Sequence, residues 1–595
     1  MKKTKMETKL KIHPAIGIAR VGNSAPESGP PVLGEHFYIG PNEAGGLPLN
    51  ADGSTTEEFR NLETQALKRQ AALFQIYVYD EQNPEGRAIQ LNDVVETKNG
   101  RQEVINIEWR VHLANKKACW YQFESLKGSG PHGYEGDHKL RNPKVTDAQA
   151  RQKLIIDPGP LTVCGPNQHA EFSKGKAQQG YPQNFPPVDI KPFPIESLGE
   201  LMTLPNGNLL VLGGKGNSGT SELPPRIDSY ANNEGWYDDV SDGPVSANVL
   251  LADGSTIEVV PAWAIVAPPA FAPQILNQVT LYDAIYDVFV RSFGLNPELY
   301  FNGQFNPKYE FDFKSEILPI VSRASQYQWV TNMPKLGQQS HEAFESNPFG
   351  RLSFPMSRLR NPDVQEDYSN IYLMPQLTGD DPFGETPPEK LLAVTRTQYH
   401  LLKFWSEADS GLPPKAPDLG PGERLDQAVL ENCVGGAFCP GIEMTWICRN
   451  TTLYEPLPAE FRASDAFRIR HKKVDGPLST TYGSDGNYSA GLEPGDISKY
   501  MAQPWQSDFN ECSDQGTGLN GSPLWWWPAQ RPYDVHVGDH GEIASWTRGM
   551  KKNVDGGHEG DLEMVSAWSK LGFVVSQPGD VYLEVQRTFE SDTNG

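Results

Sequence analysis

The sequence predicts a β-rich α+β protein with long loops. Glycine (56) and proline (50) make up nearly a fifth of the 595 residues, a share that argues against a helical bundle or a coiled coil. Hydrophobic residues form 38% and charged residues 21% of the chain, which is typical of a globular protein with buried cores. Paired strand patterns prevail before residue 270 and helical spacing appears after it. We therefore expect a strand-dominated domain over residues 1–270 and a mixed domain of helices, loops and strands over 271–595.

Two hairpins mark the N-terminal domain. Apolar runs at 198–204 and 209–212 flank Pro-Asn-Gly-Asn, and runs at 249–251 and 257–260 flank Ala-Asp-Gly-Ser. Each pair predicts two antiparallel strands joined by a tight turn. We also expect a helix over 56–74 in this domain.

The C-terminal domain begins with the clearest helical pattern. Apolar residues recur at helical spacing over 275–293, and Gly294 supplies a stop. Further helices are expected at 388–405, whose proline suits a first turn, and at 425–432. The stretches 300–385 and 450–535 are rich in Pro, Gly, Asn and Asp and predict long loops.

A short helix near the C-terminus carries one tryptophan on its apolar side. We expect Asp561 to cap a helix over 562–571, followed by strands at 573–575 and 581–585. Met564, Trp568 and Leu571 are spaced i, i+4 and i+7, so Trp568 faces inward. Core packing is the ordinary role of such a tryptophan.

Composition excludes several classes of function. The formal charge of −23 argues against nucleic-acid binding. No signal-peptide pattern follows the basic first eleven residues, and the longest apolar run, 262–272, is too short to span a membrane. We expect a protein without a membrane segment that is cytoplasmic, or exported without a conventional signal peptide, and whose six cysteines are reduced.

Metal and nucleotide sites are not expected either. Cys433, Cys439 and Cys448 lack the close spacing of zinc ligands, and glycines interrupt the pair His536 and His540. No phosphate-binding or dinucleotide-binding glycine motif stands between a strand and a helix. We therefore expect no bound metal, ATP, NAD or FAD.

Four segments together carry a family resemblance. These are 12–24 (IHPAIGIARVGNS), 236–245 (WYDDVSDGPV), 435–446 (GGAFCPGIEMTW) and 504–512 (PWQSDFNEC). In the last segment Asp508 precedes Cys512 by four residues, which keeps the carboxylate within reach of the thiol. Through these segments the chain resembles the amino-acid oxidases that carry cysteine tryptophylquinone (CTQ), a cofactor made from a cysteine and a tryptophan of the polypeptide.

The resemblance implies that Cys512 forms the thioether and that Trp568 receives two oxygens. Trp546 is the alternative tryptophan, but it lacks the expected context of a helix followed by a strand. Asp508 takes the place of the family's essential aspartate, although a capping or loop-bracing aspartate is the ordinary alternative. A primary amine attacks the quinone carbonyl to give a Schiff base, and Asp508 removes a proton from the adjacent carbon. Hydrolysis and reoxidation by O2 then release ammonia and hydrogen peroxide.

Cys439 bears on the substrate. The resemblance associates a cysteine at this position of the substrate pocket with oxidation of the lysine ε-amine and a histidine with oxidation of glycine, so L-lysine is favoured. It also implies a flavoprotein partner that completes the cofactor, and a homodimer or homotetramer. A glycine oxidase of the same family, and a homologue without the cofactor that serves as a binding or structural protein, are the alternatives. The glycine-rich hairpin end 213–216 can border the pocket, but a plain turn is its more common role.

Overall fold

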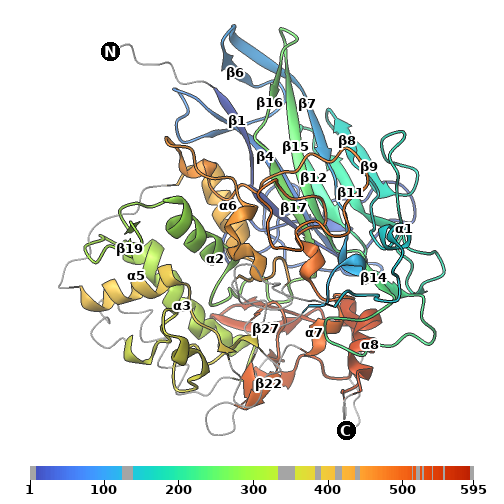
Figure 1. Cartoon of the computed structure of the whole chain (residues 1–595), viewed down its shortest axis with the longest axis vertical. Helices are drawn as coiled ribbons and strands as arrows, with labels where there is room; N and C mark the ends of the chain where they lie inside the picture. The colour runs from blue at the N-terminus through green and yellow to red at the C-terminus, as the bar shows by residue number, and fades with distance from the viewer. Residues whose placement is uncertain are drawn as a thin grey trace.

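The computed structural model combines one large sheet with helices and small strand pairs (Figure 1). It describes residues 8–123, 139–332, 356–381, 390–408, 419–435, 442–511, 514–517, 523–525, 528–538, 541–553 and 557–589. All strands of the large sheet come from residues 9–267. The α+β character and the strand-rich N-terminal part predicted from the sequence are confirmed.

The large sheet has 14 strands, and its main path runs β6-β7-β15-β17-β2-β4-β12-β11-β9. Its pairs are antiparallel except β2 with β17 and β3 with β4. The strands are β1 Lys9–His13, β2 Ile16–Arg20, β3 Phe37–Ile39, β4 Arg69–Tyr79, β5 Arg87–Ile89, β6 Val94–Thr97, β7 Gly100–Val111, β8 Leu161–Cys164, β9 His169–Ser173, β11 Ser197–Thr203, β12 Leu209–Gly213, β15 Ser241–Leu251, β16 Thr256–Glu258 and β17 Ala262–Ala267.

Both predicted hairpins are present. Leu201 pairs with Val211 across the β11–β12 turn, and Val249 pairs with Ile257 across the β15–β16 turn. The turn residues Gly207 and Gly254 both have positive φ, which explains why each four-residue turn contains a glycine.

The helix predicted over 56–74 is wrong, because Arg69–Tyr79 forms the central strand β4. This strand pairs with β12, β2, β1, β3 and β5, and nearly all of its residues are buried. Because both faces of β4 are buried, its sequence lacks the alternation of polar and apolar residues that is typical of a half-exposed strand. Its apolar spacing therefore resembles that of a helix. Tertiary pairing overrode the local pattern here.

The three predicted helices of the C-terminal part exist with different bounds. Helix α2 covers Leu281–Val288, continues as a π-helical turn over Phe289–Phe293 and ends at Gly294. It begins later than predicted because Thr280 is its N-cap in a capping box with Asp283. Helix α5 (Arg396–Glu407) begins after Thr395, so the predicted start at 388 is too early, and residue 388 itself lies outside the described residues. Helix α6 covers Pro421–Glu431.

The stretch 300–385 is not only loop, since it contains helix α3 (Leu318–Gln326) after a π-helical turn at Phe313–Ile317. Ile317 and Ile320 join Leu401 and Trp405 of α5 in a separate apolar cluster. The stretch 450–535 is closer to the prediction, with short 3-10 turns and helix α7 (Ser507–Glu511).

Besides short 3-10 turns, the other elements before residue 546 are α1 Ala148–Gln152, β10 Lys191–Pro192, β13 Ser218–Thr220, β14 Trp236–Asp238, β18 Tyr300–Phe301, β19 Gln304–Phe305, β20 Thr378–Asp381, β21 Lys390–Leu391, β22 Asp514–Thr517, β23 Pro523–Trp525, β24 Asp534–Val537 and β25 Glu542–Ser545.

The chain ends in helix α8 (Glu559–Ala567), a 3-10 turn at Trp568–Lys570, and the antiparallel strands β26 (Phe573–Gln577) and β27 (Val581–Val585). This order confirms the predicted helix and strands. Asp561 is not the N-cap, because the helix begins two residues before it. Its carboxylate instead bonds to His558 and Asn553 at the buried start of α8.

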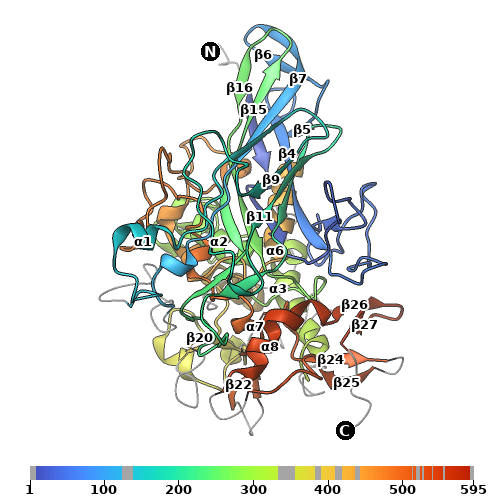
Figure 2. The same cartoon turned by 90° about the vertical axis from the view of Figure 1, so that its right-hand side faces the viewer.

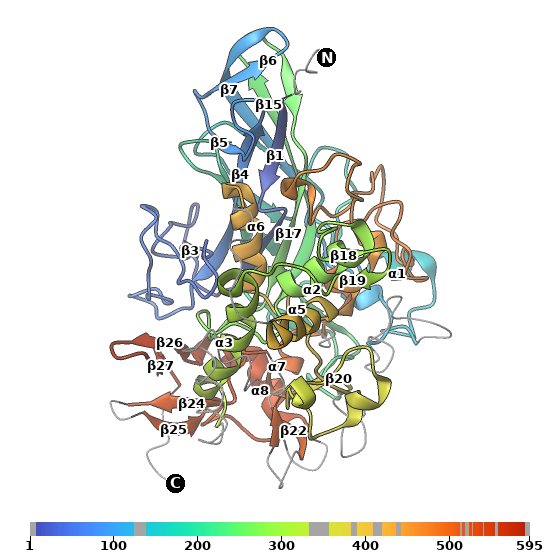
Figure 3. The same ribbon diagram turned by 90° about the vertical axis from the view of Figure 1, so that its left-hand side faces the viewer.

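One apolar core joins the parts that we predicted as two domains. It runs from Ile12 and Phe74 in the sheet through Phe271 to Trp568 and Phe573. The region of α7, α8 and β26 lies below the sheet (Figure 2), and α2, α5 and α6 lie along the side of the molecule that Figure 3 shows. None of the described helices is long and apolar enough to cross a membrane.

Candidate active site

Trp568 lies at the end of α8 with 3% of its surface exposed. Met564 and Leu571 are fully buried beside it in the core, so the predicted inward face is confirmed. The ring of Trp505 meets the Trp568 ring edge-on, with 5.3 Å between centroids. The Nε1 hydrogen of Trp505 is buried and has no acceptor within the described part of the chain.

Asp508 lies on α7 with 1% of its surface exposed. The Arg531 guanidinium forms an ion pair with its Oδ2 atom at 2.6 Å and donates a hydrogen bond to its backbone oxygen at 2.7 Å. The same guanidinium lies 4.7 Å from the centre of the Phe509 ring. Arg531 therefore fixes the position of the carboxylate and compensates its charge in a buried setting. Sequence reasoning missed Arg531, because a single arginine in a loop carries no local signal.

Helices α7 and α8 pack against each other (Figure 2), which brings the elements of Asp508 and Trp568 together across 60 residues of sequence. Phe509 of α7 and Trp505 just before it pack edge-on, with 5.2 Å between ring centroids. Cys512 follows the last residue of α7 and, like Cys439, lies outside the described residues. The structure thus joins two of the four predicted site residues and leaves the other two as predictions.

The glycine-rich end of β12 lies against Trp568. An ideal Cβ atom at Gly216 would come within 2.2 Å of Cζ2 and 2.7 Å of Cη2 of the indole, so no side chain fits here. Gly216 also has φ +75°, which favours glycine. The side chain of Gln506 donates to the Gly216 oxygen at 3.0 Å and accepts from the Ser218 hydroxyl at 2.6 Å. This segment therefore packs against Trp568 and forms one wall of the candidate site, in addition to being a turn.

Two consecutive buried aspartates hold the segments around Trp568. Asp238 accepts the backbone N–H of Trp505 at 2.9 Å and pairs with Lys117 at 2.7 Å. Asp239 accepts the backbone N–H of Asn217 at 2.9 Å. Burial lowers the pKa of Lys117 to about 8, although the charge of Asp238 opposes this shift. Both aspartates belong to the segment 236–245, whose chemical role the sequence did not reveal.

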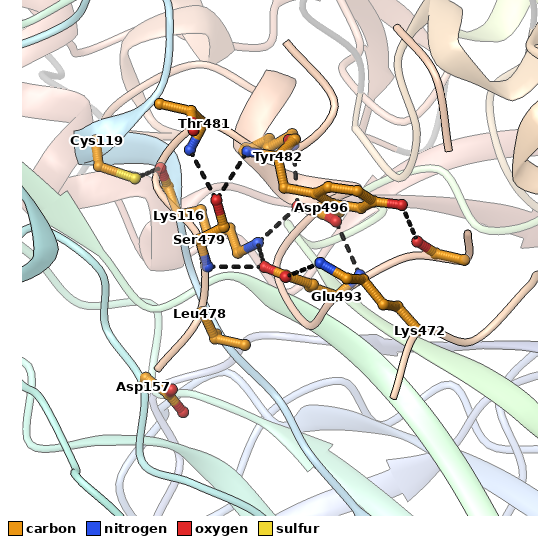
Figure 4. Close-up of polar contacts among 12 residues, drawn as sticks. Lys116, Cys119, Asp157, Lys472, Leu478, Ser479, Thr481, Tyr482, Glu493 and Asp496 are labelled. Carbon is orange, nitrogen blue, oxygen red and sulfur yellow. Dashed lines mark hydrogen bonds and ion pairs between the residues drawn. The ribbon is translucent and has the colours of Figure 1, made fainter. Parts of the chain in front are cut away.

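Lys116 connects the same region to the long loop after residue 470. Its ammonium group lies 2.7 Å from Glu493 and 2.7 Å from Asp496, and Lys472 reaches Glu493 at 2.6 Å (Figure 4). Burial opposes ionisation of Glu493, but the charge and hydrogen bond of Lys116 outweigh it and lower the pKa of Glu493 to about 2. Since Lys116 and Lys117 are neighbours, one short turn anchors both this loop and the segment before Asp508.

Comparison with known proteins places this chain in a family. The N-terminal model of the L-lysine ε-oxidases matches residues 13–266, and their C-terminal domain model matches residues 375–527. The chain is 31% identical to the L-lysine 6-oxidase of Marinomonas mediterranea over 95% of its own length and 87% of that protein. The chain belongs to the L-lysine ε-oxidase family. It is an oxidase of this family.

Solved structures extend the match to the whole fold. The L-Lys ε-oxidase of Marinomonas mediterranea superimposes with a TM-score of 0.79 at 30% identity, covering 98% of this chain and 95% of the other. A structure described as the Schiff base intermediate of that enzyme with L-Lys gives a TM-score of 0.81 at 29% identity, with the same coverage. The family resemblance read from the four sequence segments is confirmed, and so is the fold class.

Proposed function

We propose that the protein oxidatively deaminates the ε-amine of L-lysine with a CTQ cofactor made from Cys512 and Trp568, and that O2 is the electron acceptor. Ammonia and hydrogen peroxide are then products. The observation that carries this proposal is the 31% identity to an L-lysine 6-oxidase over nearly the whole chain, with Asp508 and Trp568 on packed helices. The relative whose structure is described as a Schiff base intermediate with L-Lys supports the same substrate and the same chemistry.

The residues around Trp568 fit such a cofactor. Gly216 meets the Cζ2–Cη2 edge of the indole without a side chain of its own, and the Trp505 N–H beside the ring lacks an acceptor within the described ranges. Cys512 follows directly on helix α7, which packs against the helix that ends at Trp568. The quinone supplies an electrophilic carbonyl and takes up two electrons.

The remaining chemistry falls to residues of the chain. Asp508 accepts, at a carboxylate oxygen, the proton that leaves the carbon bearing the substrate amine. Arg531 orients that carboxylate through an ion pair with Oδ2 and also binds the backbone oxygen of Asp508. Trp505 and Phe509, both nearly or fully buried, cover the site with aromatic surface and exclude water. We place Cys439 in the substrate pocket, where it favours lysine over glycine.

Maturation and assembly complete the proposal. We infer that a separate flavoprotein completes the modification of Trp568 after folding, and that the enzyme is a homodimer or homotetramer. The division of the chain near residue 270 is proposed as the border between a β-rich N-terminal domain and the catalytic domain.

A peroxide assay tests this proposal. The chain coexpressed with the flavoprotein is supplied with L-lysine, glycine and the other common amino acids, and the organic product is identified. We expect peroxide with L-lysine and an aldehyde at its ε-carbon, and on the order of 100-fold or more loss in Asp508→Asn. Faster turnover of glycine would overturn the substrate, and absence of peroxide with every amino acid would overturn the oxidase activity.

A further inference from the structure

We propose that Asp239 is a positioning residue, which holds the segment 214–217 against the indole edge of Trp568 where the quinone forms. The inference rests on the proposed function, because it assigns Asp239 a role in building and presenting that cofactor. Asp239 acts through the backbone of this segment, which lies against the ring at Gly216.

The segment 214–217 is held from two sides. Gln506, just before α7, fixes the Gly216 oxygen, and the Asp239 carboxylate accepts the N–H of Asn217. The backbone N–H of Asp239 also donates to the Asn217 oxygen at 3.2 Å. These bonds fix the two peptide groups that follow Gly216, and Gly216 is the residue of this segment whose ideal Cβ would collide with Trp568.

Gly214 allows Asp239 to come so close. An ideal Cβ at Gly214 would lie 2.5 Å from Cγ and 2.5 Å from Oδ2 of Asp239, so only glycine leaves space for the carboxyl group. Gly214 and Gly216 thus leave space for different groups. Gly214 admits the carboxyl group, and Gly216 admits the indole.

Asp239 has features that are not expected of an aspartate with a merely structural role. It is 1% exposed, and its Oδ1 atom is buried without a hydrogen-bond partner among the residues that the structure describes. The nearby cation Lys117 forms its ion pair with Asp238. Burial, opposed by the backbone bonds and aided by the charge of Asp238, raises the pKa of Asp239 to about 7. Such costly placement is typical of functional sites.

Variants of Asp239 test the inference in chains coexpressed with the flavoprotein. Asp239→Asn keeps an oxygen acceptor for the N–H of Asn217, whereas Asp239→Leu has similar volume and no acceptor. We measure the fraction of chain carrying the modification by intact mass, the quinone absorbance, kcat and KM separately, and the melting temperature. Asp242→Asn serves as a control, because that buried carboxylate binds the N–H groups of Ile497 and Ser498.

We expect Asp239→Leu to lose modification or kcat by on the order of 100-fold, as a misplacement of about 1 Å can. Asp239→Asn should rescue most of that loss, and Asp242→Asn should lower the melting temperature without changing modification per folded chain. A folded Asp239→Leu protein with wild-type modification, kcat and KM would overturn the inference, and so would equal losses in both control and test variants.

Gly214→Ala keeps the test decisive if the leucine variant does not fold. Its new Cβ displaces the Asp239 carboxyl group without removing any charged side chain. Loss of modification in this variant supports the inference, and wild-type modification contradicts it. If the wild-type chain itself carries no quinone, the proposed function fails, and this result is distinct from a failure of Asp239 alone.

Discussion

Substitution of Gly216 by alanine probes the site most sharply. The new Cβ would lie 2.2 Å from Cζ2 of Trp568, whereas ordinary contact begins at 3.4 Å, so wall and ring must separate by 1.2 Å. Overpacking of this kind costs about 1 to 3 kcal/mol, and a non-glycine residue at φ +75° costs about 1 to 2 kcal/mol more. We expect a total loss of about 2 to 5 kcal/mol in the free energy of unfolding.

Gly254→Ala is the matched control. Gly254 has φ +82° in the β15–β16 turn and nothing lies within 4 Å of its ideal Cβ, so it bears the strain without the collision. Denaturant unfolding of both variants separates the two contributions, and intact mass reports the modification. We expect Gly254→Ala to lose only about 1 to 2 kcal/mol and to keep its quinone, while Gly216→Ala loses the quinone. If Gly216→Ala and Gly254→Ala lost the same free energy of unfolding and both carried a normal quinone, the placement of Gly216 against Trp568 would be refuted.

Four further changes have separate outcomes. Cys512→Ala should give a folded chain whose mass lacks the crosslink and whose solution lacks quinone absorbance, so retained colour would show that another residue forms the thioether. Asp508→Ala should fold and lose the quinone absorbance as well, and a coloured variant would contradict its place in the site. Glu493→Gln should lower the free energy of unfolding at pH 7, because the ion pair with Lys116 keeps the Glu493 pKa at about 2. That stabilisation is present above pH 4.5 and is lost toward pH 2, so chemical unfolding at several pH values should show the gap to wild type closing in this range. A gap independent of pH would refute the charge argument. Cys439→His should shift the ratio of peroxide formed from lysine and from glycine toward glycine, and an unchanged ratio would remove Cys439 from the specificity argument.

Local patterns were sufficient where neighbouring residues decide the structure. The turn glycines Gly207 and Gly254 marked both hairpins, and the spacing of Met564, Trp568 and Leu571 marked the buried face of the last helix. A turn glycine reports the local backbone conformation, and apolar spacing reports one buried face of a helix. Both can be read from a short window of sequence.

Sequence patterns were not sufficient where contacts between segments distant in sequence determine the structure. Strand β4 was mistaken for a helix because its partners on both edges lie elsewhere in the chain. The ion pair of Arg531 with Asp508, and the contact of Gly216 with Trp568, join residues that share no sequence motif. The resemblance implies which residues react, but only the fold shows what contacts Asp508 and Trp568.

The most direct test of the central claim is the mass of one peptide pair. The chain coexpressed with the flavoprotein is reduced, which breaks any disulfide but leaves a thioether intact, and is then digested, and the fragments that contain Cys512 and Trp568 are analysed. The proposed function predicts a single crosslinked species that carries two added oxygens and lacks the hydrogens lost on quinone formation and crosslinking. Two separate peptides of unmodified mass would contradict it.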